Sequence, residues 1–296
     1  MTSKGDFHVH STHSDGRLRP SELADMAHRN GVRVLTLSDH DTTAGLAEMA
    51  ETLRRYPEIR LVPGVELSTD IPGSEIHILG FFMDVDDPGF QRELARFREG
   101  RLGRGQEMVR KLNALGMDIT WERVREIAGD ASVGRPHVAQ ALLEKGYVQT
   151  NAEAFDRYIG RTGPAYAERE KMTPAQAIEL IRRAGGISFF AHPAYTDDME
   201  RFLPGLKEAG LTGMEVYYKS YAPETVEWLR QQAEFNGLLP LGGSDYHGLG
   251  NENDREIGDI PLPDEAIENF LKIGDEILAG REATRLDRGG SGSAAG

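Results

Sequence analysis

The chain has 296 residues, and its 34 lysines and arginines against 48 aspartates and glutamates give a formal charge of −14. This acidic balance argues against a general coat for nucleic acid, and the lack of cysteine excludes disulfides, zinc–thiolate sites and cysteine nucleophiles. The 39% of hydrophobic residues can bury the core of one large domain, or of one domain with an insert. No apolar stretch approaches the ~20 residues of a membrane span, and Met1–Gly5 has no apolar signal core, so we expect a cytoplasmic protein with no membrane partner.

Predicted helices and strands alternate over much of the chain. The helix expected at 20–30 begins near Pro20 and stops at Gly31, and the strand expected at 32–37 is apolar and rich in β-branched residues. Such alternation is typical of crossover units around a mostly parallel sheet or barrel. The further elements expected are a helix at 42–56, strands at 60–67 and 76–82, a helix at 174–184, strands at 186–191 and 214–217, a helix at 224–236, a strand at 238–242 and a helix at 263–279.

The alternation breaks between residues 88 and 169, where the sequence predicts helices and almost no strand. We expect an all-helical insert that caps the barrel mouth. The alternative is that these segments are barrel helices joined by long loops. The barrel itself would be discontinuous, built from residues 5–87 and 170–285. Glycine and serine dominate the last residues, so 286–296 is expected to be a flexible tail.

Polar side chains gather where the predicted strands end. His8 and His10 alternate along the first strand, so both imidazoles would face the same side. Each polar residue alone has an ordinary structural explanation, such as a core histidine for His77 or an arginine partner for Glu66. The whole set, placed at the carboxyl ends of predicted strands or in the loops that follow them, comprises His8, His10, Asp15, His40, Glu66, His77, His192, Asp245 and His247.

Together these residues bring six imidazoles and three carboxylates to one place. Burying them without a partner would be very costly, and divalent metal ions are the partner that accepts this mixture of ligands. In parallel α/β barrels the carboxyl ends of the strands meet at one mouth, where sites are built. The sequence therefore predicts a metal site at the barrel mouth. Bound cations would reverse the local field, so the acidic chain can still bind a nucleotide or an RNA end.

The ordered motifs His8-x-His10, Ser38–Asp41, Gly64–Glu66 and Ser244-Asp245-x-His247 resemble the signature of the PHP (polymerase and histidinol phosphatase) superfamily. The resemblance implies a distorted (β/α)7 barrel of PHP type with three divalent ions. Manganese is the ion most expected, and iron or zinc would suit the same ligands. The implied ligands are His8, His10, Glu66 and Asp245 for one ion, Asp15, His40 and His247 for a second, and Glu66, His77 and His192 for the third, with Glu66 bridging.

The same resemblance implies metal-dependent hydrolysis of a phosphate ester. The attacking group would be a metal-bound hydroxide held by Asp15, Asp245 and His247. No covalent nucleophile is needed, which agrees with the lack of cysteine. The general acid is left open between a metal-bound water and His137.

Two motifs in the insert point to a subfamily. Ser132–Ala139 and Thr162–Tyr166 are similar to the cap motifs of the branch that acts on nucleoside 3′,5′-bisphosphates and RNA 5′ ends. Arg135 offers a planar fork of donors that matches phosphate, and the helix expected to start beside it favours anions at its N-terminus. We therefore expect Arg135, His137 and Tyr166 to contact the substrate. The alternatives are an ordinary surface arginine, a helix-capping histidine and a core tyrosine.

The expected activity is hydrolysis of a phosphate ester of a nucleotide, either a nucleoside 3′,5′-bisphosphate such as 3′-phosphoadenosine 5′-phosphate or the 5′ end of a short RNA. General binding of duplex DNA is not expected, and no obligate protein partner is evident. One alternative is a histidinol-phosphate-type or other small-molecule phosphomonoesterase, against which the helical insert argues. From a different class, a non-catalytic metal- or nucleotide-binding module stays open.

Overall fold

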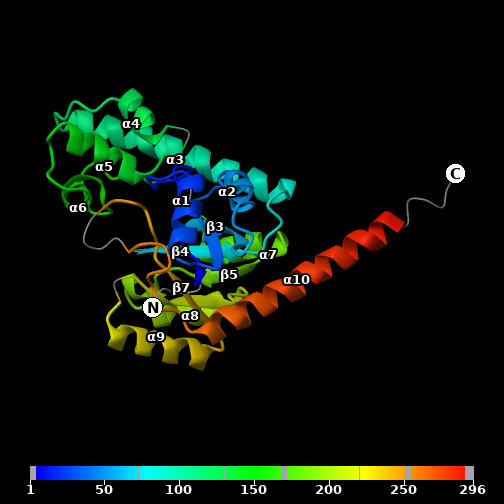
Figure 1. The fold of residues 1–296 in the computed structure, drawn as a ribbon. Helices are drawn as coiled ribbons and strands as arrows, with labels where there is room; N and C mark the ends of the chain where they lie inside the picture. The colour runs from blue at the N-terminus through cyan, green and yellow to red at the C-terminus, as the bar shows by residue number, and fades with distance from the viewer. Residues whose placement is uncertain are drawn as a thin grey trace.

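The computed structural model describes residues 5–71, 74–129, 131, 133–168, 172–219, 221–250 and 255–290. Seven strands follow one another in chain order around a nearly closed barrel, which confirms the predicted α/β barrel (Figure 1). A parallel bridge between Val9 and Tyr246 joins the chain just beyond the first and last strands. The strands are β1 (Gly5–Asp6), β2 (Val34–Leu37), β3 (Arg60–Ile71), β4 (Ser74–Phe81), β5 (Ile187–Phe190), β6 (Gly213–Tyr218) and β7 (Leu239–Gly243).

Strand β4 runs against the direction of the other strands. It pairs antiparallel with both β3 and β5, whereas the remaining neighbours pair in parallel. The prediction that His77 lies at the carboxyl end of its strand is therefore wrong, because His77 lies in the first half of β4, opposite Ser68. Since β4 is reversed, its first half lies at the end of the barrel where the parallel strands finish. His77 reaches the mouth by this route.

Amphipathic helices cover the outside of the barrel. They are α1 (Pro20–Arg29), α2 (Leu46–Leu53), α7 (Pro174–Arg183), α8 (Met199–Glu208) and α9 (Pro223–Asn236). In α7, Ile178 and Ile181 are buried in one cluster with Val65 and Ile78 of the sheet, which is the spacing of a helix with one apolar face. Helix α8 was not predicted from the sequence, and it carries Pro204 in its interior.

Aromatic rings close the end of the barrel opposite the mouth. Phe81 lies there because it is at the carboxyl end of the reversed strand β4. Its ring meets those of Phe189 and Phe270 edge to face, with centroids 5.2 and 5.1 Å apart. Phe270 belongs to α10 (Asp264–Gly290), so this helix seals the barrel floor.

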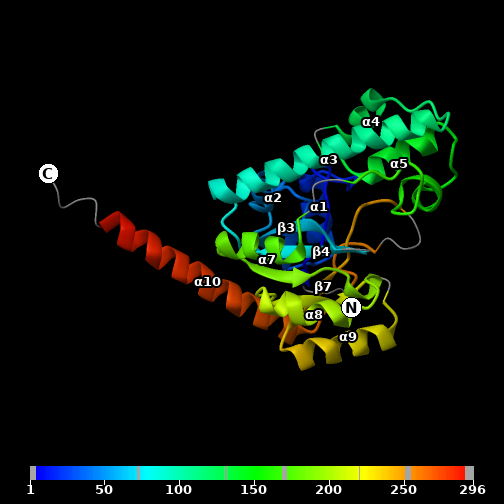
Figure 2. The ribbon, with the colours of Figure 1, turned by 180° about the vertical axis from the view of Figure 1, so that it is seen from behind.

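The distal half of α10 projects away from the body of the protein (Figure 2). The sequence predicted a helix ending at 279 and a flexible tail from 286, but the helix continues to Gly290, so the tail prediction is wrong for 286–290. Residues 281–287 are mostly strong helix formers, and Gly280 alone does not end the helix. The rest of the expected tail, 291–296, lies outside the described residues. Within the described ranges, no helix is both long and apolar enough to cross a membrane.

The insert is helical and has a hydrophobic cluster of its own. It contains α3 (Pro88–Ala114), α4 (Trp121–Ala128), α5 (Arg135–Glu144), α6 (Asn151–Ala154) and a π-helical turn, η1 (Phe155–Ile159). Helix α3 runs along one side of the barrel and on to α4 and α5 (Figure 1). Its residues Phe90 and Phe97 pack in a barrel cluster, and its residues Met108 and Leu112 pack in the insert cluster. The border between the barrel and the insert, judged by which hydrophobic cluster the residues join, thus falls inside α3. The sequence analysis expected this border at residue 88.

Candidate active site

The barrel mouth collects all nine residues that the sequence singled out as metal ligands. They are supplied by segments far apart in the chain, and most of them follow directly on a strand. His8 and His10 come after β1, Asp15 from the next loop, His40 after β2, Glu66 from β3, His77 from β4, His192 after β5, and Asp245 and His247 after β7.

Glu66 is the centre of this ligand cluster. Its Oε2 atom lies 3.2 Å from Nε2 of His8 and of His10, and 3.1 Å from Nδ1 of His40. Its other oxygen, Oε1, lies 2.8 Å from His77 Nδ1 and 3.1 Å from His192 Nε2. The carboxylate is only 1% exposed. One buried carboxylate therefore contacts five imidazoles, which suits a bridging ligand between ions.

Asp245 completes the first group of ligands. Its Oδ1 atom lies 3.3 Å from His8 Nε2 and 3.1 Å from His10 Nε2. Two ligands at ~2.1 Å from one ion are themselves ~3.0 to 3.4 Å apart for angles between about 90° and tetrahedral, so these separations fit donors that share a cation. Among the described residues, His8 Nε2, His10 Nε2 and Asp15 Oδ1 are buried and have no partner in hydrogen-bonding geometry. Cations bound at these atoms would remove the cost of leaving them unsatisfied.

His40 lies between the other two groups. Asp15 Oδ1 is 3.3 Å from His247 Nε2, and Asp15 Oδ2 is 3.8 Å from His40 Nε2. The resemblance places His40 with Asp15 and His247 alone. In the structure it also lies within ligand distance of Glu66 and His77. The donor set thus fits divalent ions, and His40 faces two of the candidate positions.

Burial and charge shift the pKa values of this cluster in opposite directions. Burial would raise the pKa of Glu66, but the neighbouring imidazoles, that of His40 first, hold it well below its ordinary value. Burial lowers the pKa of His10, but Asp245 and Glu66 outweigh it and raise this pKa to about 10. Burial lowers the pKa of His40 to about 3. Because metal ligands must be deprotonated, ion binding at His10 would displace a proton.

Glu215 is a supporting residue that the sequence analysis missed. It is 1% exposed in β6, and its Oε1 atom lies 3.0 Å from His8 Nδ1. Its Oε2 atom accepts the backbone N–H of His192 at 2.7 Å. A carboxylate on Nδ1 keeps the proton there and leaves Nε2 of His8 for an ion. The signal in the sequence was an acidic residue between apolar neighbours in a predicted strand.

Asp39 plays the same supporting part for the loop that carries Asp15. It accepts the backbone N–H of Ser11 and its hydroxyl, each at 2.7 Å, and the hydroxyl of Ser14 at 2.6 Å. All three of these residues are buried. These hydrogen bonds give Asp39 of the Ser38–Asp41 motif a structural role, because they fix the loop that carries Asp15.

Asp245 is held by two neighbours besides the histidines. The Tyr218 hydroxyl donates to Asp245 Oδ2 at 2.5 Å, and the Lys219 ammonium lies 2.9 Å from the same atom. These two contacts direct the other oxygen of Asp245, Oδ1, to the imidazoles of His8 and His10. Asp245 and His192 both have positive φ, 47° and 34°, which is uncommon outside glycine and concentrates at functional sites. Burial, followed by Asp245, raises the pKa of Tyr218 well above its ordinary value.

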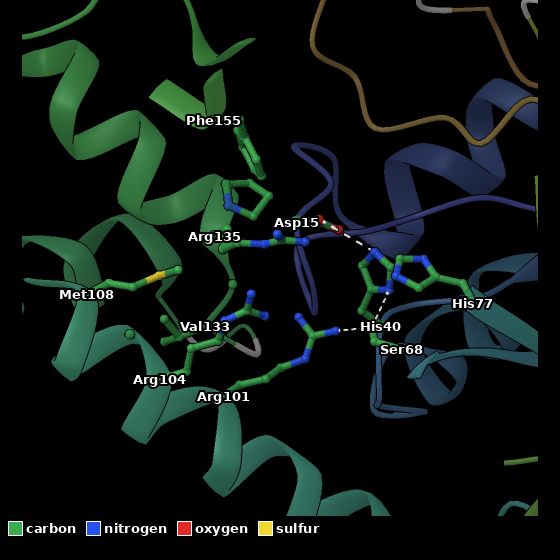
Figure 3. A pocket seen from close by; sticks show the side chains of 13 residues that line it. Asp15, His40, Ser68, His77, Arg101, Arg104, Met108, Val133, Arg135 and Phe155 are labelled. Atoms are coloured by element: carbon green, nitrogen blue, oxygen red, sulfur yellow. Dashed lines mark hydrogen bonds and ion pairs between the residues drawn. The ribbon is translucent and has the colours of Figure 1, made fainter. Parts of the chain in front are cut away.

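A cavity joins the ligand cluster to the insert (Figure 3). On the barrel side it is lined by Asp15, His40 and His77, and on the insert side by guanidinium groups from α3 and α5. These are Arg101, Arg104 and Arg135, with Arg135 lying 5.3 Å over the ring of Phe155. In Figure 3 the three arginine side chains extend toward the barrel residues.

Arg101 and Arg104 were missed by the sequence analysis. Arg101 Nε lies 2.6 Å from Asp41 Oδ2, so it ties α3 to the loop after β2. Arg98, one turn earlier, donates to the Asp41 carbonyl at 3.1 Å. The signal was the spacing of three between Arg98, Arg101 and Arg104, which places the three side chains along one face of a helix.

His137 and Tyr166 lie differently from Arg135. His137 Nδ1 accepts the backbone N–H of Gly134 at 2.9 Å and so caps α5, and burial lowers its pKa. Tyr166 packs against the insert cluster, with Arg104 5.3 Å over its ring. Neither is among the described residues that line the cavity. His137 also lies near the backbone of Ser14 and the charge of Asp15 in the mouth loop. The contact of His137 and Tyr166 with substrate therefore stays a prediction beside the alternatives of a helix-capping histidine and a packed tyrosine.

Comparison with known proteins agrees with this site. Residues 6–184 match the PHP domain, so the chain belongs to the PHP family. It is 36% identical to a 5′-3′ exoribonuclease of Haemophilus influenzae over 83% of this chain and 91% of that protein. It is 33% identical to a 3′,5′-nucleoside bisphosphate phosphatase of Chromobacterium violaceum, over 86% of this chain and 92% of that protein.

A solved structure shares the fold over most of the chain. It is an amidohydrolase from Chromobacterium violaceum with bound sulfate and no metal, 30% identical, with a TM-score of 0.84 over 92% of this chain and 97% of its own. Membership of the PHP family, the ligand cluster and the adjoining cavity define a metal-dependent phosphoesterase, a hydrolase that acts on phosphate esters.

Proposed function

We propose that the protein hydrolyses the bond between O3′ and phosphorus in a nucleotide that carries a 5′-phosphate. A nucleoside 3′,5′-bisphosphate and the 5′ end of a short RNA both contain this bond. An exonuclease that needs a 5′-phosphate must leave one on the RNA that remains after each cleavage. Cleavage of the O3′–P bond does this, because the phosphate stays on the 5′ oxygen of the next nucleotide. The names of the two relatives, a bisphosphate phosphatase and a 5′-3′ exoribonuclease, support both substrates.

The observation that carries this proposal is the cavity that lies between candidate metal ligands and three arginines. One side has the candidate metal ligands Asp15, His40 and His77, and the other has Arg101, Arg104 and Arg135. A substrate with two phosphates could occupy both sides at once. A simple monoester would use only the ligand side.

The nine ligands would hold up to three divalent ions, with manganese the expected metal. Ions bound there supply a Lewis acid for the phosphoryl oxygens and lower the pKa of water. The residues of the chain position the ester. Glu66 is held by burial, His8 by Glu215, and Asp245 by Tyr218 and Lys219, so the ligand geometry is built before substrate arrives.

Arg135 would bind the 5′-phosphate. A guanidinium group presents several donors in one plane and can engage a phosphate through two parallel hydrogen bonds. Its position over the Phe155 ring restrains the plane of the guanidinium and reduces the conformational freedom lost on binding. Arg101, tied to Asp41, would add positive charge and fix the height of α3 above the mouth.

One assay series tests the proposal with the intact, manganese-supplemented protein. The substrates are 3′-phosphoadenosine 5′-phosphate, a 5′-phosphorylated oligoribonucleotide, the same oligonucleotide without its 5′-phosphate, and histidinol phosphate. We expect kcat/KM to be highest for the first two and to fall by at least tenfold when the 5′-phosphate is absent. Preference for histidinol phosphate would contradict the nucleotide assignment, and no turnover of any ester would favour a binding module.

A further inference from the structure

An exposed tyrosine, Tyr195, stands beside His192 of the ligand cluster and is not among the described residues that line the arginine cavity. Tyr195 ends the short helix η2 (Pro193–Tyr195), which directly follows His192. It is 61% exposed. Its ring centroid lies 6.3 Å from that of His192, 5.7 Å from that of Tyr218 and 5.8 Å from that of Tyr221.

Two neighbouring tyrosines, Tyr218 and Tyr221, hold the turn that carries Tyr195 in place. The Tyr221 hydroxyl accepts the backbone N–H of Ala194 at 3.0 Å, and the Tyr218 hydroxyl is engaged by Asp245. The rings of Tyr218 and Tyr221 are inclined to Tyr195 by 79° and 63°, so neither is stacked parallel to it. Tyr195 is thus a positioned aromatic ring with a large open surface.

A row of ring contacts leads from the arginine cavity to this tyrosine. His40, which lines the cavity, lies 5.1 Å from His77, and His77 lies 5.1 Å from His192. His192 in turn lies beside Tyr195. His77 lines the cavity as well, so only His192 lies between the cavity wall and Tyr195 in this row of contacts.

We propose that Tyr195 is a stacking platform for the nucleobase that follows the scissile phosphate in single-stranded RNA. This inference rests on the proposed function, in which the 5′ nucleotide lies on the arginine side. The next nucleotide would then leave the ligand cluster past His192, where Tyr195 is exposed. Every base has an aromatic face, so such a contact is strong but tolerant of sequence. A nucleoside bisphosphate has no second base and would not use it.

The test compares two substrates in the intact, manganese-supplemented protein. We expect Tyr195→Ala to lower the ratio of kcat/KM for a 5′-phosphorylated diribonucleotide over that for 3′-phosphoadenosine 5′-phosphate by roughly 5- to 150-fold, the range for loss of one base–aromatic stack. Most of the change should appear in KM. Tyr195→Phe should restore the ratio, because it keeps the ring. A diribonucleotide whose second nucleotide lacks a base should give wild type and Tyr195→Ala the same ratio.

Phe235→Ala is the matched control, since Phe235 is an exposed aromatic residue at 86% on the outer helix α9. It should leave the ratio unchanged. The platform is overturned if Tyr195→Ala keeps the wild-type ratio, or if both substrates fall in parallel, which would mean that Tyr195 only supports His192. Wild type that hydrolyses the bisphosphate but no oligonucleotide also overturns it and leaves the phosphatase activity standing. Wild type that hydrolyses neither overturns the proposed function itself.

Discussion

The barrel mouth and the insert hold their charged groups in different ways. At the mouth the side chains are short, and the innermost are buried and fixed on both sides, as His8 is by Glu66 and Glu215. In the insert the charges are the long, partly exposed arginines of two helices, reaching back toward the mouth. Ion ligands must sit within fractions of an ångström, and strand ends with buried supporting contacts can provide this. Recognition of a second phosphate tolerates looser geometry. The substrate preference can therefore change when the insert changes, while the hydrolytic reaction at the mouth remains the same.

The largest effect should come from the centre of the mouth. Glu66→Gln removes the carboxylate that contacts five imidazoles, so we expect kcat to fall by about a thousandfold or more, given that bound ions contribute several kcal/mol. Turnover of an aryl phosphate and metal content by elemental analysis measure this, with circular dichroism as the check on folding. Near-normal turnover with a full metal complement would show that Glu66 is not a ligand.

The next effect should be confined to substrates with two phosphates. Arg135→Ala should lower kcat/KM for 3′-phosphoadenosine 5′-phosphate by roughly 10- to 150-fold, the worth of a hydrogen bond to a charged group. An aryl monophosphate, which does not reach the arginine side of the cavity, should change little. Arg135→Lys, which keeps the charge but not the planar fork, should recover only part of the loss. An equal fall for both substrates would place Arg135 in support of the mouth instead.

A supporting residue at the mouth should have a moderate effect. Glu215→Gln keeps the size of the side chain but weakens its hold on His8 Nδ1 and on the His192 N–H. We expect metal affinity or kcat to fall about 10- to 100-fold, as for other partners of metal ligands. Added manganese should recover part of the activity if affinity is the cause. An unchanged metal titration together with unchanged turnover would contradict this role.

The smallest effects concern α3, the helix that joins the two regions. A Cβ at Gly100 would meet no heavy atom within 4 Å, whereas one at Gly105 would lie 2.9 Å from the Trp121 ring in the insert cluster. Gly100→Ala should therefore raise the free energy of unfolding by about 0.5–1 kcal/mol, and Gly105→Ala should lower it by about 1–3 kcal/mol through overpacking. Urea denaturation measures both. Stabilisation by Gly105→Ala would contradict the close contact with Trp121.

Some of the site was open to prediction because it follows from local rules. His8, His10, His40, His192 and Asp245 come within a few residues of the ends of strands that finish at one mouth. The expected strand around His8 and His10 is wrong, because β1 ends at Asp6 and Val9 beyond it forms an isolated bridge. The reversal of β4 was not predicted because the strands expected at 60–67 and 76–82 were too far apart to suggest a hairpin. In the structure β3 extends to Ile71 and β4 begins at Ser74. The extension of both strands to this tight turn depends on pairing between them, and the periodicity of a single segment gives no information about pairing.

The sequence by itself determined the barrel, the helical insert and the residue types of the ligand cluster, since these depend on hydrophobic pattern and on the chemistry of imidazoles and carboxylates. Only the tertiary structure decided that Arg101 and Arg104 line the cavity with Arg135, and that His137 caps a helix. Long side chains can reach several sites from one position. Which site they reach depends on how α3 and α5 lie over the mouth, and that is set by packing between residues far apart in the chain.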